Sequence, residues 1–205
     1  MNCEHYAHAL FIHICCAVNN SMDFTSLSHG QIQSKIWLCE SLEPYIPTNA
    51  TIAILGSWYN ILGMMLLFRN PSKYNFIVGI DSDPNVIPIA NKVCEGYMIQ
   101  PTVKIKNICA DANTYNLQGY QVVINCSVEH MESTNWFNNL TANTLVCIQS
   151  SNVQQSDNNF DIKSPNQSID RLVEKFPCRK FYHKKTKNFQ YNEWGYSRYM
   201  TIGLK

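Results

Sequence analysis

Short apolar runs alternate with longer mixed segments along most of the chain. Five runs rich in Ile and Val have the length of buried strands, and they cover residues 51–57, 74–81, 102–111, 120–127 and 144–150. The segments between them are long enough to hold a helix. Strands that alternate with helices in this way predict a mostly parallel sheet with helices on both faces.

The alternation stops near the C-terminus. A helix-like segment at 169–176 is followed by two strand-like runs, 178–189 and 195–205, with no helix between them. Such a pair predicts a terminal β-hairpin. We therefore predict an α/β fold with a Rossmann-like, mostly parallel seven-stranded sheet, helices on both faces and an antiparallel C-terminal β-hairpin. We expect one domain over 1–205, with N-terminal helices in 1–50 and the α/β core in 51–205.

The composition agrees with one sizeable core. The chain has 205 residues, of which 45% are hydrophobic and 15% charged. No apolar run approaches a membrane span and no leader with a cleavage site is recognisable, so we expect a cytoplasmic protein that does not engage a membrane. The nine cysteines show neither a CxxC pair nor the spacing of a disulfide framework. The His and Cys residues within 3–16 fit no standard zinc spacing, so no metal is predicted.

Glycine and polar residues stand where the predicted strands end, which is the edge at which open α/β sheets bind ligands. The first strand runs into the sequence AILGSWYNILG, the second into VGIDSDP and the third into CADA. Glycine lets the backbone pass close to a ligand, and a carboxylate can accept hydrogen bonds from two neighbouring hydroxyls. The same positions are also typical of turn and helix-cap residues.

The order of these strand ends, together with the terminal hairpin, resembles the class I S-adenosylmethionine (SAM) methyltransferases over residues 51–205. The resemblance implies that SAM is the cofactor and S-adenosylhomocysteine (SAH) the product. It implies that Asp81 binds both ribose hydroxyls and that Asp111 lies near the adenine amino group. The repeated glycines of the family's first motif are missing here. The implied cofactor-binding residues are Gly56, Ser57, Trp58, Tyr59, Asp81, Ser82, Ala110, Asp111, Ala112 and Asn125.

The fourth strand leads into VVINCSVEHM, which is similar to the Glu-His ending of many small-molecule methyltransferases. Methyl transfer needs an aligned acceptor and removal of a proton from it, and a histidine titrates near neutral pH. We therefore predict His130 as the general base and Glu129 as the residue that orients the base or the acceptor. The predicted acceptor-binding residues are Ser127, Gln149, Ser151 and Asn152. In this family the helix before the first strand often covers the cofactor, which brings Gln31 and Lys35 near it.

The acceptor is predicted to be a small molecule, and alternatives stay open. From Lys163 to Lys205 there are ten Lys or Arg against three Asp or Glu, although the whole chain carries a net charge of only +1. Basic residues interleaved with aromatics suit nucleic acid, so a nucleic-acid methyltransferase that uses the hairpin is one alternative. A non-catalytic scaffold with the same fold is another. A nicotinamide-dependent oxidoreductase fits less well because GxGxxG is absent. We expect a monomer or a homodimer.

Overall fold

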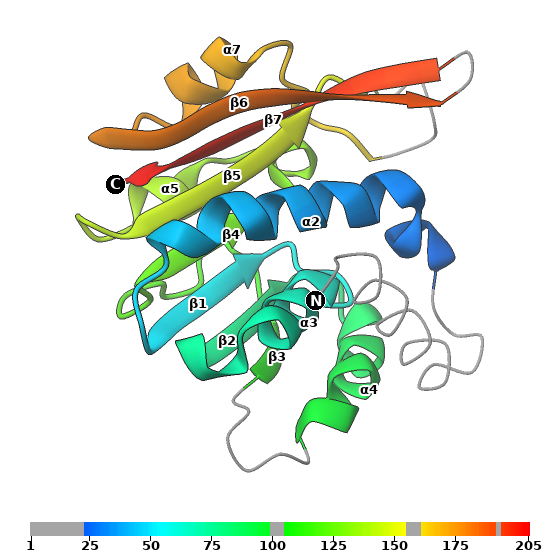
Figure 1. Ribbon diagram of the computed structural model, residues 1–205, viewed down its shortest axis with the longest axis vertical. Helices are drawn as coiled ribbons and strands as arrows, with labels where there is room; N and C mark the ends of the chain where they lie inside the picture. Colours follow the sequence, from blue (N-terminus) through cyan, green and yellow to red (C-terminus); the bar gives the residue numbers. More distant parts are fainter. Residues whose placement is uncertain (1–22, 99–104, 155–160, 192–193) are drawn as a thin grey trace.

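A computed structural model describes residues 23–98, 105–154, 161–191 and 194–205 (Figure 1). One seven-stranded sheet runs through the molecule in the order β3-β2-β1-β4-β5-β7-β6. The strands are β1 (Ala50–Leu55), β2 (Tyr74–Asp81), β3 (Ile105–Cys109), β4 (Val122–Asn125), β5 (Leu145–Ser151), β6 (Lys180–Tyr191) and β7 (Trp194–Leu204). Strands β1 to β5 are parallel, whereas β7 is antiparallel to both β5 and β6. The predicted fold class and its terminal hairpin are confirmed.

Helices cover both faces of the sheet. The α-helices are α2 (His29–Leu42), α3 (Ile61–Arg69), α4 (Val86–Met98), α5 (Asn135–Asn138) and α7 (Ile169–Lys175). Short 3-10 turns are η1 (Phe24–Leu27), η2 (Glu43–Tyr45), η3 (Pro71–Lys73) and η4 (Val128–His130). Helices α2, α3 and α4 share one buried cluster with the sheet, and α5 and α7 share the other. No helix within these described ranges is long and apolar enough to cross a bilayer.

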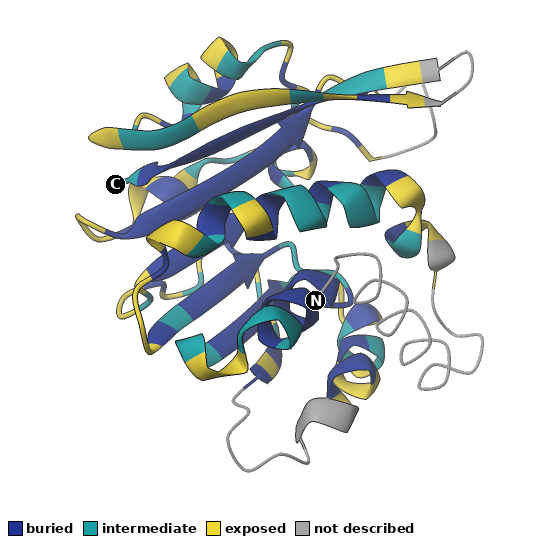
Figure 2. Cartoon of the chain, viewed as in Figure 1, coloured by how far each residue is buried: buried dark blue, intermediate teal, exposed yellow. Residues whose placement is uncertain are grey.

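Burial follows the order of the strands. The central strands β4 and β5 are buried along their whole length, while β6 forms a more exposed edge (Figure 2). Under α5 and α7, the rings of Trp136, Phe137 and Phe176 are nearly inaccessible to solvent, and their centroids lie 5.3 to 5.6 Å apart. Edge-to-face contacts of this kind add to the burial of apolar area. These three rings belong to the buried cluster on the α5 and α7 face of the sheet.

Polar residues precede both α2 and α4, but their side chains make different contacts. Helix α2 begins after Ser28, but the Ser28 side chain makes no capping hydrogen bond. The Asp83 carboxylate accepts the backbone N–H of Asn85 at 2.8 Å, and α4 begins one residue later, at Val86. Aspartate therefore closes the turn before α4 and does not cap the helix through its side chain.

Candidate functional site

Backbone hydrogen bonds join the ends of the first three strands at the carboxyl edge of the sheet. The Ser57 N–H donates to the Ile80 carbonyl at 3.1 Å, and the Trp58 N–H donates to Asp81 Oδ2 at 2.8 Å. On the other side, the Ala110 N–H donates to the Asp81 carbonyl at 2.9 Å. Asp81 is therefore the hub between the turn after β1 and the turn after β3. Three of the predicted cofactor-binding segments meet at this residue.

The turn after β1 requires glycine at position 56. Gly56 has φ +58°, and a Cβ added there would lie 2.5 Å from Ser127 Cβ and 2.7 Å from Ser127 Oγ. The Ser127 hydroxyl also donates to the Gly56 carbonyl at 2.9 Å. Gly56 can adopt the left-handed backbone conformation and also lets Ser127 approach its Cα, which are two common reasons for glycine in such turns. Ser127, predicted to face the acceptor, is the residue that approaches Gly56.

Two aromatic residues follow the glycine. Trp58 is partly exposed and has φ +50°, and its ring stacks on that of Tyr59 with centroids 5.1 Å apart. Tyr59 is buried, and its hydroxyl accepts the Asp23 N–H at 3.2 Å, so it fastens the chain before α2 to this turn. The Ser57 hydroxyl is buried and has no hydrogen-bond partner within the described ranges. Of these three, Trp58 is the residue that presents a large surface to the edge of the sheet.

A buried asparagine pair that the sequence did not point to supports the turn from below. Asn60 has φ +53° and is fully buried, and its Nδ2 donates to Asn107 Oδ1 at 2.8 Å. The pair lies against Gly79, where an added Cβ would be 2.6 Å from Asn60 Nδ2. Asparagine tolerates the left-handed region better than most residues, which suits it to begin α3 here. The turn is therefore held in place by side chains of β3 as well as by Asp81.

The Asp81 carboxylate keeps capacity for a ligand. Its Oδ2 accepts from Trp58, and its Oδ1 accepts the Asp83 N–H at 3.1 Å. Each carboxylate oxygen can accept a second hydrogen bond, and the side chain is partly exposed. Two ribose hydroxyls therefore fit the remaining positions. The neighbouring Ser82 is exposed at the same edge.

The turn after β3 presents Asp111 to solvent. Its Oδ1 accepts the Asn113 N–H at 2.9 Å, so the carboxylate also organises its own turn. Ala112 is buried in the cluster beneath α5, whereas Ala110 is partly exposed. These contacts leave the second Asp111 oxygen without a hydrogen-bond partner among the described residues and available to a donor such as an amino group. The adenine role of Asp111 stays a prediction.

Asn125 ends β4 and is engaged within the protein. It is fully buried, its Nδ2 lies 3.3 Å from Met131 Sδ, and its Oδ1 accepts the Ser127 N–H at 2.9 Å. These bonds shape the turn that carries Ser127 toward Gly56. The predicted contact of Asn125 with the cofactor stays a prediction.

Glu129 and His130 occupy different environments although they are adjacent in η4. Glu129 is 4% exposed. Its Oε1 accepts from Ser151 Oγ at 3.4 Å, and its Oε2 is buried without a hydrogen-bond partner in the described part of the chain. His130 is exposed, and its Nδ1 lies 2.7 Å from the Asp161 carbonyl oxygen. Because a carbonyl oxygen only accepts, Nδ1 carries the proton in the neutral ring and Nε2 keeps a free lone pair. The arrangement thus holds a buried carboxyl group beside an oriented imidazole.

The predicted acceptor residues at the end of β5 also include both buried and exposed side chains. Gln149 is fully buried and is joined to α2 by two hydrogen bonds. Ser34 Oγ donates to Gln149 Oε1 at 2.9 Å, and Gln149 Nε2 donates to the Ser34 carbonyl at 3.1 Å. Ser151 is buried against Glu129. Asn152 is exposed and is held by Ser197, whose N–H donates to Asn152 Oδ1 at 2.8 Å. Gln149 therefore fixes the helix that covers this edge, and Ser151 lies nearest to the predicted catalytic pair.

The described residues fit a SAM molecule at its ribose end, where Asp81 has two free acceptor positions beside a turn that only glycine can make. No group of three or more His, Cys, Asp or Glu side chains suited to a metal occurs in the described ranges. The His and Cys residues within 3–16, for which no metal was predicted, lie outside the described residues.

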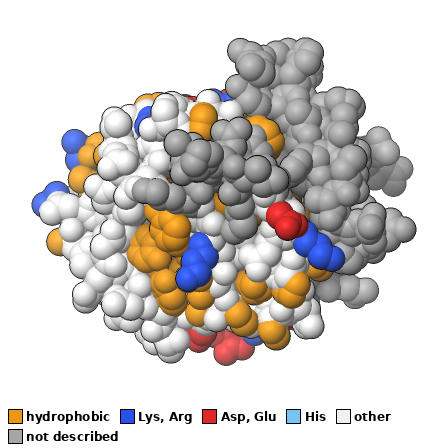
Figure 3. Space-filling view, turned by 90° about the horizontal axis from the view of Figure 1, so that it is seen from below, with side chains coloured by type: hydrophobic (Ala, Val, Ile, Leu, Met, Phe, Trp, Pro, Cys, Tyr) orange, Lys and Arg blue, Asp and Glu red, His pale blue; other side chains and the backbone are white. Residues whose placement is uncertain are grey.

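The basic hairpin presents lysines mainly on the edge strand β6. Lys180, Lys184 and Lys187 lie over the rings of Tyr182, Phe181 and Phe189, with distances to the ring centroids of 4.9, 5.4 and 5.5 Å. Such contacts use the aromatic faces that would otherwise stack on bases. On the different face seen in Figure 3, the visible Lys and Arg side chains stand apart from one another.

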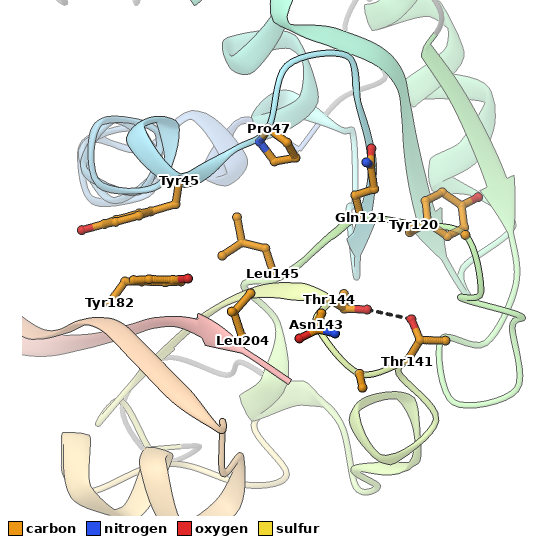
Figure 4. A pocket seen from close by; sticks show the side chains of 12 residues that line it. Tyr45, Pro47, Tyr120, Gln121, Thr141, Asn143, Thr144, Leu145, Tyr182 and Leu204 are labelled. Atoms are coloured by element: carbon orange, nitrogen blue, oxygen red, sulfur yellow. Dashed lines mark hydrogen bonds between the residues drawn. The ribbon is translucent and has the colours of Figure 1, made fainter.

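A cavity of about 510 Å³ lies at the opposite edge of the sheet, near the amino ends of β4 and β5 (Figure 4). Tyr45 and Tyr182 stack at its mouth with centroids 4.8 Å apart, and the Thr141 and Thr144 hydroxyls lie 3.0 Å apart on its wall. None of the predicted site residues lines this cavity. It is therefore separate from the candidate site at the carboxyl edge.

No family model and no curated protein sequence matches this chain. Solved structures share its fold. Magnesium protoporphyrin IX methyltransferase from Synechocystis PCC 6803 with bound SAH is similar over 83% of this chain and 82% of its own, with a TM-score of 0.61 and 9% identity. TehB from Haemophilus influenzae is similar over 89% of this chain and 67% of its own, with a TM-score of 0.60 and 13% identity. The tRNA methyltransferase TrmK of B. subtilis is similar over 80% of this chain and 64% of its own, with a TM-score of 0.52 and 12% identity. At these identities the likeness shows a Rossmann-like methyltransferase fold.

Proposed function

We propose that this chain is a SAM-dependent methyltransferase that acts on a small molecule. The observation that carries the proposal is the hub at Asp81, which joins the turn after β1 to the turn after β3 and still has two acceptor positions. The methyltransferase fold of the solved structures supports the SAM-dependent part of this proposal and leaves the acceptor open.

SAM supplies an activated methyl group when it is bound, so the protein has to hold the cofactor, align the acceptor and receive a proton. Asp81 would hold the ribose hydroxyls, and Asp111 would accept from the adenine amino group. The turn from Gly56 to Tyr59 would lie beside the cofactor, with Trp58 excluding water from it. Ser82, Ala110 and Ala112 complete the proposed cofactor surface on the neighbouring turns.

His130 is the proposed general base. Its Nδ1 bond to the Asp161 carbonyl at 2.7 Å fixes the neutral tautomer in which Nε2 accepts a proton. Glu129 is the proposed orienting group, because its buried Oε2 has no partner and would accept a hydrogen bond from an N–H or O–H of the acceptor. Ser151, which donates to the other oxygen of Glu129, keeps that carboxyl group in position.

A small molecule is favoured because the candidate catalytic pair lies beside buried groups and not on the lysine-rich edge. Glu129 and Ser151 are both at most 4% exposed. The lysines of β6 lie on the outer strand of the sheet, where three of them cover aromatic rings. A nucleic acid bound through those lysines is the alternative acceptor, and its affinity would fall steeply as salt rises.

A transfer assay tests this function. The full-length protein is incubated with SAM labelled in the methyl group and with fractionated small-molecule extracts, RNA or DNA, and the label in each fraction is measured. We expect label in a small-molecule fraction, with transfer lowered at least about tenfold in His130→Gln. Lys184→Gln on the exposed edge of the hairpin is the control and should transfer label like the wild type. Label found only in nucleic acid, and lost in Lys184→Gln, would contradict the small-molecule assignment.

A further inference from the structure

Three polar residues form a row across the strands β5, β7 and β6 near the carboxyl edge. In the sheet register, Arg198 of β7 stands opposite Ser151 of β5 on one side and opposite Lys187 of β6 on the other. Residues directly opposite in antiparallel strands point to the same face. Met200, two residues after Arg198, belongs to the buried cluster under α2, so the row faces α2.

Helix α2 crosses this face close to the row. Ser34 on α2 is hydrogen-bonded to Gln149, which lies two residues before Ser151 on β5. Figure 1 shows α2 lying in front of β5, with its N-terminal half toward the edge where β1 and β5 end. The residue after Ser34 is Lys35, which brings a further cation to the same region.

Arg198 is buried without a counter-ion. It is 6% exposed, and its Nε is buried with no hydrogen-bond partner among the residues that the structure describes. The ring of Tyr196 lies 5.8 Å from its guanidinium carbon, which is a cation–π contact and not a hydrogen bond. None of the ion pairs among the described residues includes Arg198 or Lys35. A guanidinium is always charged, so its planar donors lack an anion within the part of the chain that the structure describes.

Lys35 lies near Arg198 and is partly buried. Its Nζ donates to Gln31 Oε1 at 2.9 Å, a neutral partner on the same helix. Burial lowers the pKa of Lys35 to about 8, and the nearby Arg198 charge acts in the same direction. The Cys126 thiol does not supply a negative charge at neutral pH, because burial raises its pKa to about 11. The charge of Lys35 is therefore also left without an anionic partner among the described residues.

Such an arrangement is unfavourable in the protein alone. A buried charge is costly unless it is paired, and like charges directly opposite on neighbouring strands repel each other. Arg198 and Lys187 are such a pair. A bound anion removes both costs, and the fork of an arginine matches the two oxygens of a carboxylate or a phosphate.

We propose that the methyl acceptor carries an anionic group, a carboxylate or a phosphate, that binds against Arg198 and Lys35 under the N-terminal half of α2. This inference rests on the proposed function. The site adjoins the candidate catalytic pair, because Ser151 stands opposite Arg198 and donates to Glu129. Arg198 and Lys35 thus anchor the acceptor at its anionic end, and Glu129 meets it at the reacting end.

Anion-dependent thermal unfolding of the full-length protein tests the site. Tm is measured against sodium phosphate and, separately, sodium succinate, with ionic strength held constant by sodium chloride. We expect a saturable rise in Tm with at least one of the two anions, which then identifies phosphate or carboxylate as the group bound. The apparent Kd should rise at least about tenfold in Arg198→Met and about threefold in Lys35→Met.

The control is Arg179→Met, which removes an exposed arginine whose Nη2 donates to Asn143. It should respond to the anion like the wild type. Arg198→Lys keeps the charge and should show an intermediate Kd, which covers the case in which Arg198→Met does not fold. A response equal in Arg198→Met and the wild type, or no saturable response to either anion, would overturn the proposed site.

SAH titration of the same variants separates this proposal from the proposed function. We expect the Kd of Arg198→Met for SAH to stay within about threefold of the wild type, because Arg198 is assigned to the acceptor and not to the cofactor. Loss of the anion response in a wild type that binds SAH refutes the anion site alone. A wild type that does not bind SAH refutes the methyltransferase assignment and with it the role of the anion as acceptor.

Discussion

Replacing Gly56 by alanine tests the geometry of the turn on which the cofactor proposal depends. The left-handed conformation at φ +58° costs a residue with a Cβ about 1 kcal/mol or slightly more. The added Cβ would also lie 2.5 Å from Ser127 Cβ, and overpacking of this kind costs about 1–3 kcal/mol. Displacing Ser127 would weaken its 2.9 Å bond to the Gly56 carbonyl, worth about 1 kcal/mol. We expect Gly56→Ala to lower the free energy of unfolding by about 3–4 kcal/mol, or Tm by roughly 10 °C.

The assay is urea unfolding followed by circular dichroism, with two further variants. Gly119→Ala is the matched control, because Gly119 has φ +86° but no atom within 4 Å of an added Cβ, so only the conformational cost of about 1 kcal/mol applies. The double variant Gly56→Ala/Ser127→Gly removes the close atom and should recover about 1–2 kcal/mol relative to the sum of the single effects. Equal costs at positions 56 and 119, or additive effects in the double variant, would refute the proposed contact between Gly56 and Ser127.

Three other predictions concern the support of the site, its chemistry and its charge. Asn60→Ala removes the buried bond to Asn107 and should cost about 2 kcal/mol in urea unfolding, whereas the exposed variant Asn116→Ala should change stability by less than about 0.5 kcal/mol. His130→Gln should lower kcat on the identified acceptor while the Kd for SAH stays unchanged, and an equal loss in both would show that His130 acts in cofactor binding. Burial lowers the pKa of Lys35 from 10.5 to about 8. Between pH 8 and pH 10.5 the folded protein therefore binds fewer protons than the unfolded chain, and the contribution of Lys35 to the free energy of unfolding rises with pH. Urea unfolding at several pH values should show this rise flattened in Lys35→Met, and an unchanged slope would contradict the burial of the charge; phosphate affinity should fall over the same pH range.

Hydrophobic periodicity predicted the sheet because the strands are buried on both faces. The residues of β2 are those of the predicted strand 74–81, and β1, β4 and β5 differ from their predictions by a few residues at the ends. The terminal hairpin followed from two strand-like runs with no helix between them. The predicted strand 120–127 runs past the end of β4 at Asn125, because the sequence pattern does not show where the hydrogen-bonded pairing of strands stops.

The candidate site was only partly predictable. Asp81 could be found because an acidic residue after a buried strand stands at a ligand-binding edge. Asn60 and Asn107 gave no signal, since two single polar residues in apolar segments show no pairing until the strands are placed side by side. In the sequence, Arg198 resembles an ordinary outward-facing residue of a hairpin strand, and its burial becomes apparent only in the folded structure. The acidic pattern of the site is local in the sequence, whereas the cationic pattern depends on tertiary packing.

Calorimetric titration of the full-length protein with SAH tests the central claim most directly. The account predicts micromolar binding that weakens roughly a hundredfold in Asp81→Ala, because the carboxylate provides two charge-assisted hydrogen bonds to the ribose. Asp81→Asn keeps an oxygen for the Trp58 N–H and should weaken binding less, while Asp170→Ala on the exposed surface of α7 should bind like the wild type. A folded wild-type protein that does not bind SAH, or an Asp81→Ala variant that binds it as tightly as the wild type, would contradict the account.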